Sequence, residues 1–183
     1  CGKHLLVAGG SNFEDNLPWR GGTKLYHEKV YLLSLNKKGT YSWSQSDTPL
    51  PEPLAYSACI SIPGGILSVG GENKNGPVNK VYLLSCRQHK LIARPMPDLP
   101  DAITSAGTAL IGNKVYVIGG MNVKGAVASC YAIDISLKKP VWEKLPDLPH
   151  ALSHGVVVAQ NDGNETCVYV VGGRYRQGEV STF

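Results

Sequence analysis

The sequence lacks several features by which membrane proteins, nucleic-acid-binding proteins and common hydrolases are recognised. No apolar run approaches 18 residues in the 183-residue chain, so a membrane-spanning helix is not expected. Only 17% of the residues are charged, the net charge is only +4, and the basic residues are scattered along the sequence. This argues against nucleic-acid binding. HExxH, CxxC and GxSxG motifs are absent, so zinc peptidase, thiol redox and serine hydrolase chemistry are not indicated.

Cysteine and histidine are few and show no metal-ligand pattern. The five cysteines are an odd number without framework spacing, and four fall in or beside strand-like runs, where free cysteine acts as a small apolar residue. His150 and His154 are four residues apart, but they belong to an expected loop rather than a helix. We therefore expect no metal site.

Glycine, in contrast, is abundant and follows a repeat. Gly-Gly pairs end four strand-like runs, HLLVAGG, GILSVGG, KVYVIGG and CVYVVGG. A Leu-Pro pair recurs at Pro51, Pro100 and Pro149, with both intervals equal to 49 residues. This period, with four short strands per unit, is typical of one β-propeller blade per repeat.

Each unit predicts four strands, a to d, of an all-β protein. Strand a follows the Leu-Pro pair, strand b ends in Gly-Gly, strand c carries a recurring tyrosine and strand d a recurring tryptophan. The Gly-Gly pairs are expected to let neighbouring backbones approach and to accept positive φ, and the aromatic residues to pack between blades. The units are expected at about 1–51, 52–100, 101–149 and 150–183.

The spacing of Gly-Gly, Tyr, Trp and Leu-Pro resembles the kelch repeat over essentially the whole chain. Four segments of the first hundred residues, LLVAGGSNF, GGTKLYHEKVYLL, LPEPLAYSACIS and GGILSVGGENKNG, also resemble the bacterial N-acetylneuraminate epimerase (sialic acid mutarotase) family, in particular its cyclically permuted members. The resemblance implies about four partial or full blades of a six-bladed kelch propeller near twice this length. It also implies a periplasmic or otherwise exported bacterial protein, with a cytoplasmic location left open.

The b–c and d–a connections should emerge on one face of such a propeller, and the candidate site residues lie in them. The first b–c connection carries about 12 extra residues between Ser11 and Lys29, and long loops on rigid scaffolds often carry function. A capping insert is the alternative. Tyr56, Ser105 and His154 each follow a Leu-Pro proline by five residues and should line the mouth of the central channel, unless they only bond within their loops.

The family resemblance implies that the protein interconverts the α and β anomers of sialic acid, a small sugar acid, without a cofactor. Ring opening and closure need a general base and a general acid, and a guanidinium suits the carboxylate. The catalytic candidates are Glu72, His27 and Glu28. The substrate-binding candidates are Trp19, Arg20, Tyr56, Asn73, Lys74, Asn122, His154, Arg174 and Arg176.

One departure from the family weakens the case for Glu72 as the catalyst. The family pairs a glutamate shortly after a glycine with an arginine six residues later, and here Gly71-Glu72 is followed by Val78. Glu72 is therefore better explained as a channel-lining residue, and the resemblance then implies that the catalytic glutamate and arginine lie in a blade outside this chain. The alternative function is a kelch module that binds a protein or glycan through the same face without turnover. A kelch oxidase is a third reading, but no tyrosine–cysteine copper site is recognisable.

Overall fold

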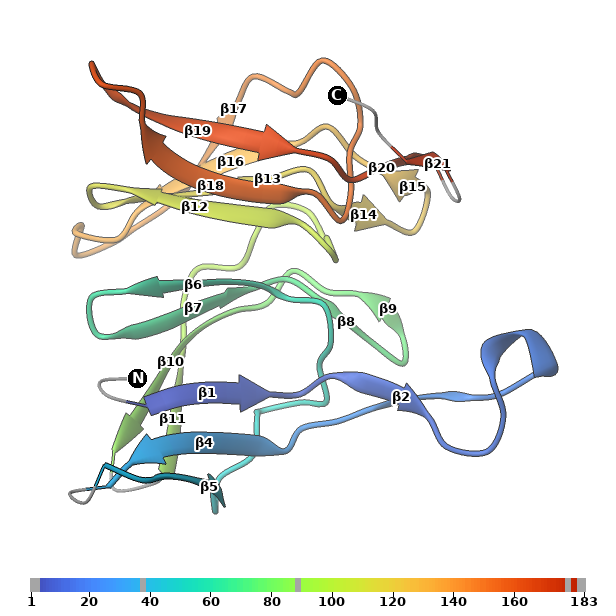
Figure 1. Cartoon of the computed structure of the whole chain (residues 1–183). Helices are drawn as coiled ribbons and strands as arrows, with labels where there is room; N and C mark the ends of the chain where they lie inside the picture. Colours follow the sequence, from blue (N-terminus) through green and yellow to red (C-terminus); the bar gives the residue numbers. More distant parts are fainter. Residues whose placement is uncertain (1–3, 37–38, 88–89, 177–178, 181–183) are drawn as a thin grey trace.

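The computed structural model describes residues 4–36, 39–87, 90–176 and 179–180, and these form short antiparallel strands (Figure 1). The 3-10 helix η1 (Pro18–Arg20) is the one helix in these ranges. None of the described residues form a helix long and apolar enough to cross a membrane. The predicted all-β architecture of repeated antiparallel sheets is confirmed, while a six-bladed ring near twice this length stays a prediction.

Four main sheets follow one another along the chain and lie side by side in Figure 1. The first has the order β1 (His4–Ala8), β4 (Val30–Leu35), β5 (Tyr41–Gln45). The second contains β6 (Ala58–Ile62), β7 (Gly65–Val69), β10 (Val81–Arg87) and β11 (Lys90–Pro95). The third contains β12 (Gly107–Ile111), β13 (Lys114–Ile118), β16 (Cys130–Asp134) and β17 (Trp142–Leu145). The fourth pairs β18 (Val156–Asn161) with β19 (Thr166–Val171).

Each b–c connection folds into a small two-stranded ribbon, and all four ribbons lie at the same end of the sheets (Figure 1, right). The ribbons are β2 (Ser11–Phe13) with β3 (Lys24–Tyr26), β8 (Glu72–Asn73) with β9 (Gly76–Pro77), β14 (Met121–Asn122) with β15 (Gly125–Ala126), and β20 (Arg174–Arg176) with β21 (Glu179–Val180). The extra residues of the first ribbon, including η1, project away from the sheets. We call this end the ribbon face and the opposite end the turn face.

The Gly-Gly pairs have the structural role that the sequence predicts. Gly70 and Gly119 have φ of 58° and 63°. A Cβ added at Gly70 would lie 2.2 Å from the carbonyl oxygen of Ile103, and one at Gly119 would lie 2.3 Å from that of Leu152. Any side chain at either position would therefore push the next sheet away.

The recurring aromatic residues pack as expected in the third sheet but not in the first. Tyr131 is buried and its hydroxyl donates to Asp101, while the Trp142 indole donates to the Pro97 carbonyl at 2.8 Å. Trp43, however, is 56% exposed, because the described residues place a neighbouring main sheet against only one side of the first sheet (Figure 1). In the second sheet, the strand register puts Ala93 at the tryptophan position.

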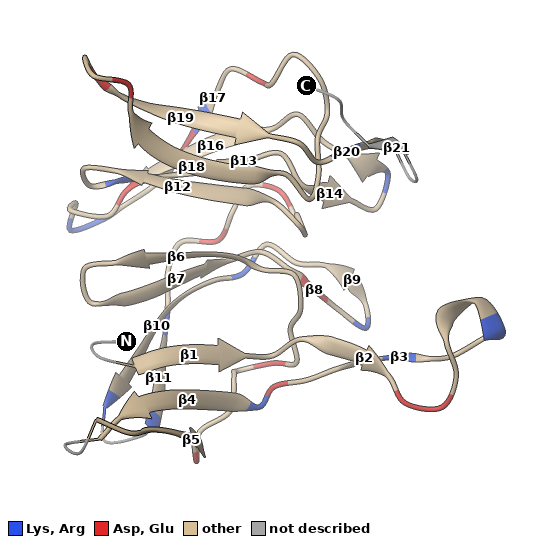
Figure 2. Cartoon of the chain, in the orientation of Figure 1, with Lys and Arg blue, Asp and Glu red and all other residues tan. Residues whose placement is uncertain are grey.

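Cysteines and charges follow no special arrangement in the described part of the chain. Cys59, Cys86, Cys130 and Cys167 are free thiols, and Cys1 lies outside the described residues. Lysine and arginine are spread along the described residues rather than gathered in one patch, and β18 and β19 contain neither (Figure 2).

Candidate functional site

The ribbon face holds a cavity of about 370 Å³ where the four main sheets converge. It is lined by Lys24, Tyr56, Glu72, Pro77, Thr104, Ser105, Met121, Asn122, Ser153, His154 and Arg174. These residues come from the ribbons and from the segments that lead into β6, β12 and β18. The cavity therefore lies at the centre of the propeller, where residues from every unit meet.

Tyr56, Ser105 and His154 form the inner rim of this cavity. Their φ values are 55°, 55° and 57°, in the left-handed region that non-glycine residues rarely adopt. The Ser105 N–H donates to the Tyr56 carbonyl at 3.0 Å, and the His154 N–H donates to the Ser105 carbonyl at 3.1 Å. These bonds between units hold the strained backbone in place. All three residues line the cavity, as the repeat predicts, while substrate binding by Tyr56 and His154 stays a prediction.

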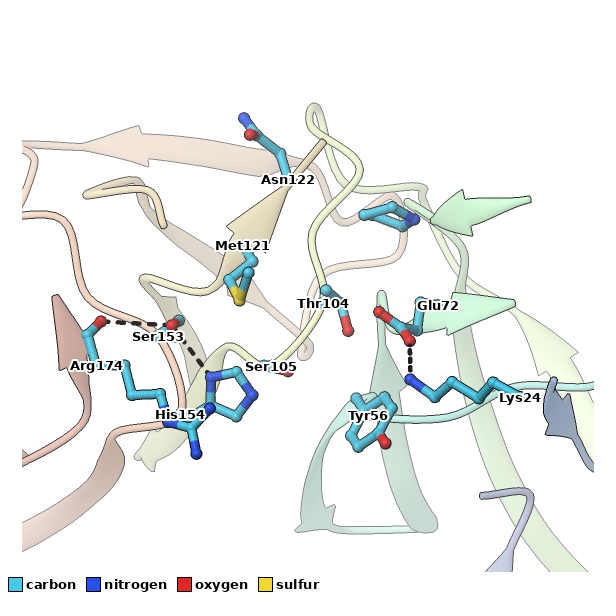
Figure 3. Close-up of a pocket in the computed structure, with 11 residues that line it drawn as sticks. Lys24, Tyr56, Glu72, Thr104, Ser105, Met121, Asn122, Ser153, His154 and Arg174 are labelled. Atoms are coloured by element: carbon cyan, nitrogen blue, oxygen red, sulfur yellow. Dashed lines mark hydrogen bonds and ion pairs between the residues drawn. The ribbon is translucent and has the colours of Figure 1, made fainter. Parts of the chain in front are cut away.

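One wall of the cavity is organised around the Glu72 carboxylate (Figure 3). It contacts Lys24 of the first ribbon, which lies 48 residues earlier in the chain. Lys24 Nζ donates to Glu72 Oε1 at 2.6 Å, and the Tyr26 hydroxyl donates to the same oxygen at 2.7 Å. Lys24 Nζ also lies 4.3 Å from the centre of the Tyr56 ring, within the range of a cation–π contact.

These contacts keep Glu72 ionised. Partial burial acts to raise the pKa of the Glu72 carboxyl, but the hydrogen bonds from Lys24 and Tyr26 outweigh it, and the pKa lies below its ordinary value. The reverse holds for Lys24, since burial lowers the pKa of its ammonium and the pairing with Glu72 raises it by more. Both groups are therefore charged near neutral pH.

The Thr104 hydroxyl is an unsatisfied polar group between the two walls. Thr104 is 4% exposed, and its hydroxyl forms no hydrogen bond with the described residues. It acts to lower the pKa of Glu72, although its geometry to the carboxylate is not that of a hydrogen bond. A buried hydroxyl without a partner costs about 1–3 kcal/mol, which a ligand hydroxyl or a water could recover.

The opposite wall carries His154 and Arg174 (Figure 3). His154 Nδ1 lies 3.1 Å from Ser153 Oγ, and the backbone of Ser153 pairs with that of Arg174. Burial and then the charge of Arg174 lower the pKa of the His154 imidazole, and the negative charge of Glu72 offsets part of this. His154 is therefore mostly neutral at pH 7.

The remaining predicted site residues fall into two groups. Asn122 lines the cavity, whereas Asn73 and Lys74 line a second hollow of about 390 Å³ between the first two ribbons, where the Asn73 amide donates to Glu52 at 2.9 Å. The described cavity is not lined by four of the candidates from the insert, Trp19, Arg20, His27 and Glu28. The side chain of Arg176 lies outside what the structure describes.

Two of these insert residues show why the insert does not close the cavity. Trp19 is 76% exposed on η1, at the projecting tip of the first ribbon. His27 Nε2 lies 2.7 Å from Asn12 Oδ1, so it bonds within the base of the ribbon.

Sequence reasoning missed Lys24 and Tyr26, the insert residues that do reach Glu72. The sequence did contain a signal for them. Alternate side chains of a strand point to the same side, so Lys24 and Tyr26, separated by one residue, could have been expected to face one partner together. No group of three or more His, Cys, Asp and Glu side chains that could hold a metal ion occurs in the described ranges.

Comparisons with known proteins agree with the repeat and the fold. The kelch motif model matches residues 103–149. The N-acetylneuraminate epimerase of Vibrio vulnificus is 37% identical over 92 residues, which cover 48% of this chain and 24% of that protein. That of Brucella suis is 35% identical over 89 residues, which cover 46% of this chain and 23% of the relative. Over the matched residues, the chain is thus similar to the kelch motif and to N-acetylneuraminate epimerases.

The structural comparison supports the fold and extends over more of the chain. The solved structure of YjhT superposes with a TM-score of 0.74 at 16% identity, over 93% of this chain and 56% of that one. This likeness shows the propeller architecture alone. The matched segments span about a quarter of the length of the curated relatives. The activity of the whole protein is therefore proposed below.

Proposed function

We propose that this protein accelerates the interconversion of the α and β anomers of a sugar acid of the N-acetylneuraminate class. The observation that carries the proposal is the pairing of two proton carriers across one cavity, an ionised Glu72 and a His154 with a lowered pKa, each beside a cation. The name of the curated relatives, N-acetylneuraminate epimerase, supports the choice of substrate.

In this proposal, Glu72 removes the proton from the anomeric hydroxyl. The O–H electron pair then forms the C=O bond of the open-chain keto acid, and the bond between the anomeric carbon and the ring oxygen breaks. Protonated His154 donates a proton to that ring oxygen as it leaves. Rotation about the adjacent carbon–carbon bond presents the other face of the carbonyl. Closure returns both protons to the groups they came from, so no cofactor is consumed.

The direct test follows anomer exchange of N-acetylneuraminate by proton NMR in the presence of the purified protein. We expect exchange well above the uncatalysed rate. Exchange at the uncatalysed rate with saturating protein would contradict the proposal.

A non-catalytic kelch module that binds a protein or glycan is the second candidate. Two observations favour it: Val78 occupies the position of the family's arginine, and Trp19 is exposed on a projecting ribbon. This candidate predicts a stable complex with a glycan or protein and no effect on anomer exchange. The NMR measurement therefore separates the two candidates.

For the cellular location we propose export in a bacterium, on the strength of the resemblance to the epimerase family alone. Fractionation of the native host, with the protein followed by a specific antibody, tests this. Recovery in the cytoplasmic fraction alone would contradict it.

A further inference from the structure

Lys24 occupies a position that its role as a partner of Glu72 does not fully explain. Its side chain is 29% exposed and that of Glu72 is 19% exposed, so the pair is partly but not fully withdrawn from water. Lys24 lines both the central cavity and the hollow between the first two ribbons. Its ammonium thus stands in the wall shared by two open spaces, where a ligand can reach it.

The ammonium also has more than one source of stabilisation. The faces of the Tyr26 and Tyr56 rings lie 5.2 Å and 4.3 Å from Nζ, and both attract a cation. An ammonium has three donor positions, and the bond to Glu72 Oε1 uses one. A second carboxylate can therefore bind Lys24 without removing Glu72 from it.

We propose that Lys24 binds the carboxylate of the sugar acid and thereby sets the anomeric carbon beside Glu72. This assignment rests on the proposed function. It differs from the expectation that an arginine holds the carboxylate. It also gives the long first ribbon a specific role, which is to bind the carboxylate of the substrate.

The chemistry of the substrate makes the location of the anchor decisive. In N-acetylneuraminate the carboxylate carbon is bonded directly to the anomeric carbon. A carboxylate held at Lys24 therefore brings the anomeric hydroxyl close to Glu72, which is 2.6 Å from the ammonium. A carboxylate held at Arg174 would instead bring the anomeric centre beside His154, on the opposite wall.

The same arrangement couples binding to proton transfer. A bound carboxylate adds a second negative charge beside Glu72 and shares the ammonium that holds Glu72 ionised. The two negative charges repel each other, which disfavours the ionised form of Glu72, so Glu72 binds a proton more readily when the ligand is present. The group that takes the anomeric proton thus becomes a stronger base on substrate binding.

The experiment compares two ligands that cannot open their rings, the methyl glycoside of N-acetylneuraminate and the neutral methyl ester of that glycoside. Titration calorimetry at low salt gives the ratio of their affinities, and we expect the unmodified protein to favour the acid by about tenfold or more. In Lys24→Met the ratio should fall to about one while the affinity for the ester is unchanged, whereas Lys24→Arg and Arg174→Met should keep the preference.

Lys124→Met provides the matched control, because it removes the same charge from an exposed position in the neighbouring β14–β15 ribbon. A Lys24→Met protein that keeps the preference for the acid overturns the assignment, as does one that loses affinity for both ligands equally, which would mark a structural role. Loss of the preference in Arg174→Met would also overturn it. If the unmodified protein binds neither ligand and leaves anomer exchange at the uncatalysed rate, the proposed function fails together with the assignment.

Discussion

The ribbon face and the turn face contain similar glycines in very different surroundings. Gly112, in the turn between β12 and β13, has φ of 57° and nothing within 4 Å of the place where a Cβ would stand. Gly119, at the ribbon end of β13, has φ of 63°, but there a Cβ would lie 2.3 Å from the Leu152 carbonyl oxygen. Gly112 is needed only to reverse the chain, whereas Gly119 also lets the next unit come close.

One ion pair on each face shows a similar difference in exposure. On the turn face, Lys114 and Glu143 are 3.6 Å apart with side chains 49% and 61% exposed. On the ribbon face, Lys24 and Glu72 are 2.6 Å apart with 29% and 19% exposed. Close approach of the units thus shields the Lys24–Glu72 pair beside the cavity, whereas the Lys80–Asp98 pair, also at the ribbon end of its sheet, has side chains 49% and 41% exposed.

The largest expected effect separates the two glycines. Gly112→Ala should cost about 1 kcal/mol in the free energy of unfolding, because only the left-handed conformation opposes the added methyl. Gly119→Ala should cost about 3 kcal/mol or more, since the methyl also collides with a backbone carbonyl that accepts the Gly120 N–H at 2.8 Å. Urea denaturation measures both values, and equal losses would remove the distinction between the faces.

The next effect concerns the two glutamates. Glu72→Gln should lower the rate of anomer exchange about 100-fold, because an amide cannot take the anomeric proton. Glu143→Gln, on the turn face, should leave the rate unchanged within about twofold. A comparable loss in both variants, measured by proton NMR, would show that the cavity is not the place of reaction.

The pH dependence of exchange should be bell-shaped with its maximum on the acidic side of pH 7. The rate falls at low pH as Glu72 becomes protonated and at high pH as His154 loses its proton, and the pKa values of both groups are lowered. Replacing His154 by Gln should remove the decline at high pH as well as lowering the rate. A maximum above pH 8 would contradict these roles.

The same two groups predict how stability depends on pH. Both have a folded-state pKa below the unfolded one, so each contributes stability that is present above its unfolded pKa and is lost as the pH falls through the folded value. For His154 the loss begins below about pH 6.5, and for Glu72 below about pH 4.5. Urea midpoints measured across this range should be flatter near pH 6 in His154→Gln and flatter near pH 4 in Glu72→Gln.

The smallest effect is expected from the exposed pair. Lys114→Met should change the free energy of unfolding by no more than about 0.5 kcal/mol, because a solvated ion pair contributes little and is screened by salt. A loss above about 1 kcal/mol in urea denaturation would mean that the turn face depends on its charges more than its exposure indicates.

The sequence was enough to predict where the site lies in the fold, but not which side chains line it. The 49-residue interval placed Tyr56, Ser105 and His154 at one rim because each occupies the same local position of a repeated unit. The length of the first b–c connection marked the insert, yet most of its polar residues lie away from the cavity. Lys24, which does reach the cavity, has no equivalent in the other units and so left no repeated signal.

The sequence by itself determined the strands, the Gly-Gly approaches and the order of the units, because hydrogen-bond periodicity and the φ preference of glycine act over a few residues. The tertiary structure alone decided that Lys24 and Tyr26 both donate to one carboxylate oxygen of Glu72. It also decided that His154 lies across the cavity from them with a lowered pKa. These contacts depend on how one sheet is rotated against the next. That rotation is set by packing summed over whole sheets, so no short segment of the chain contains it.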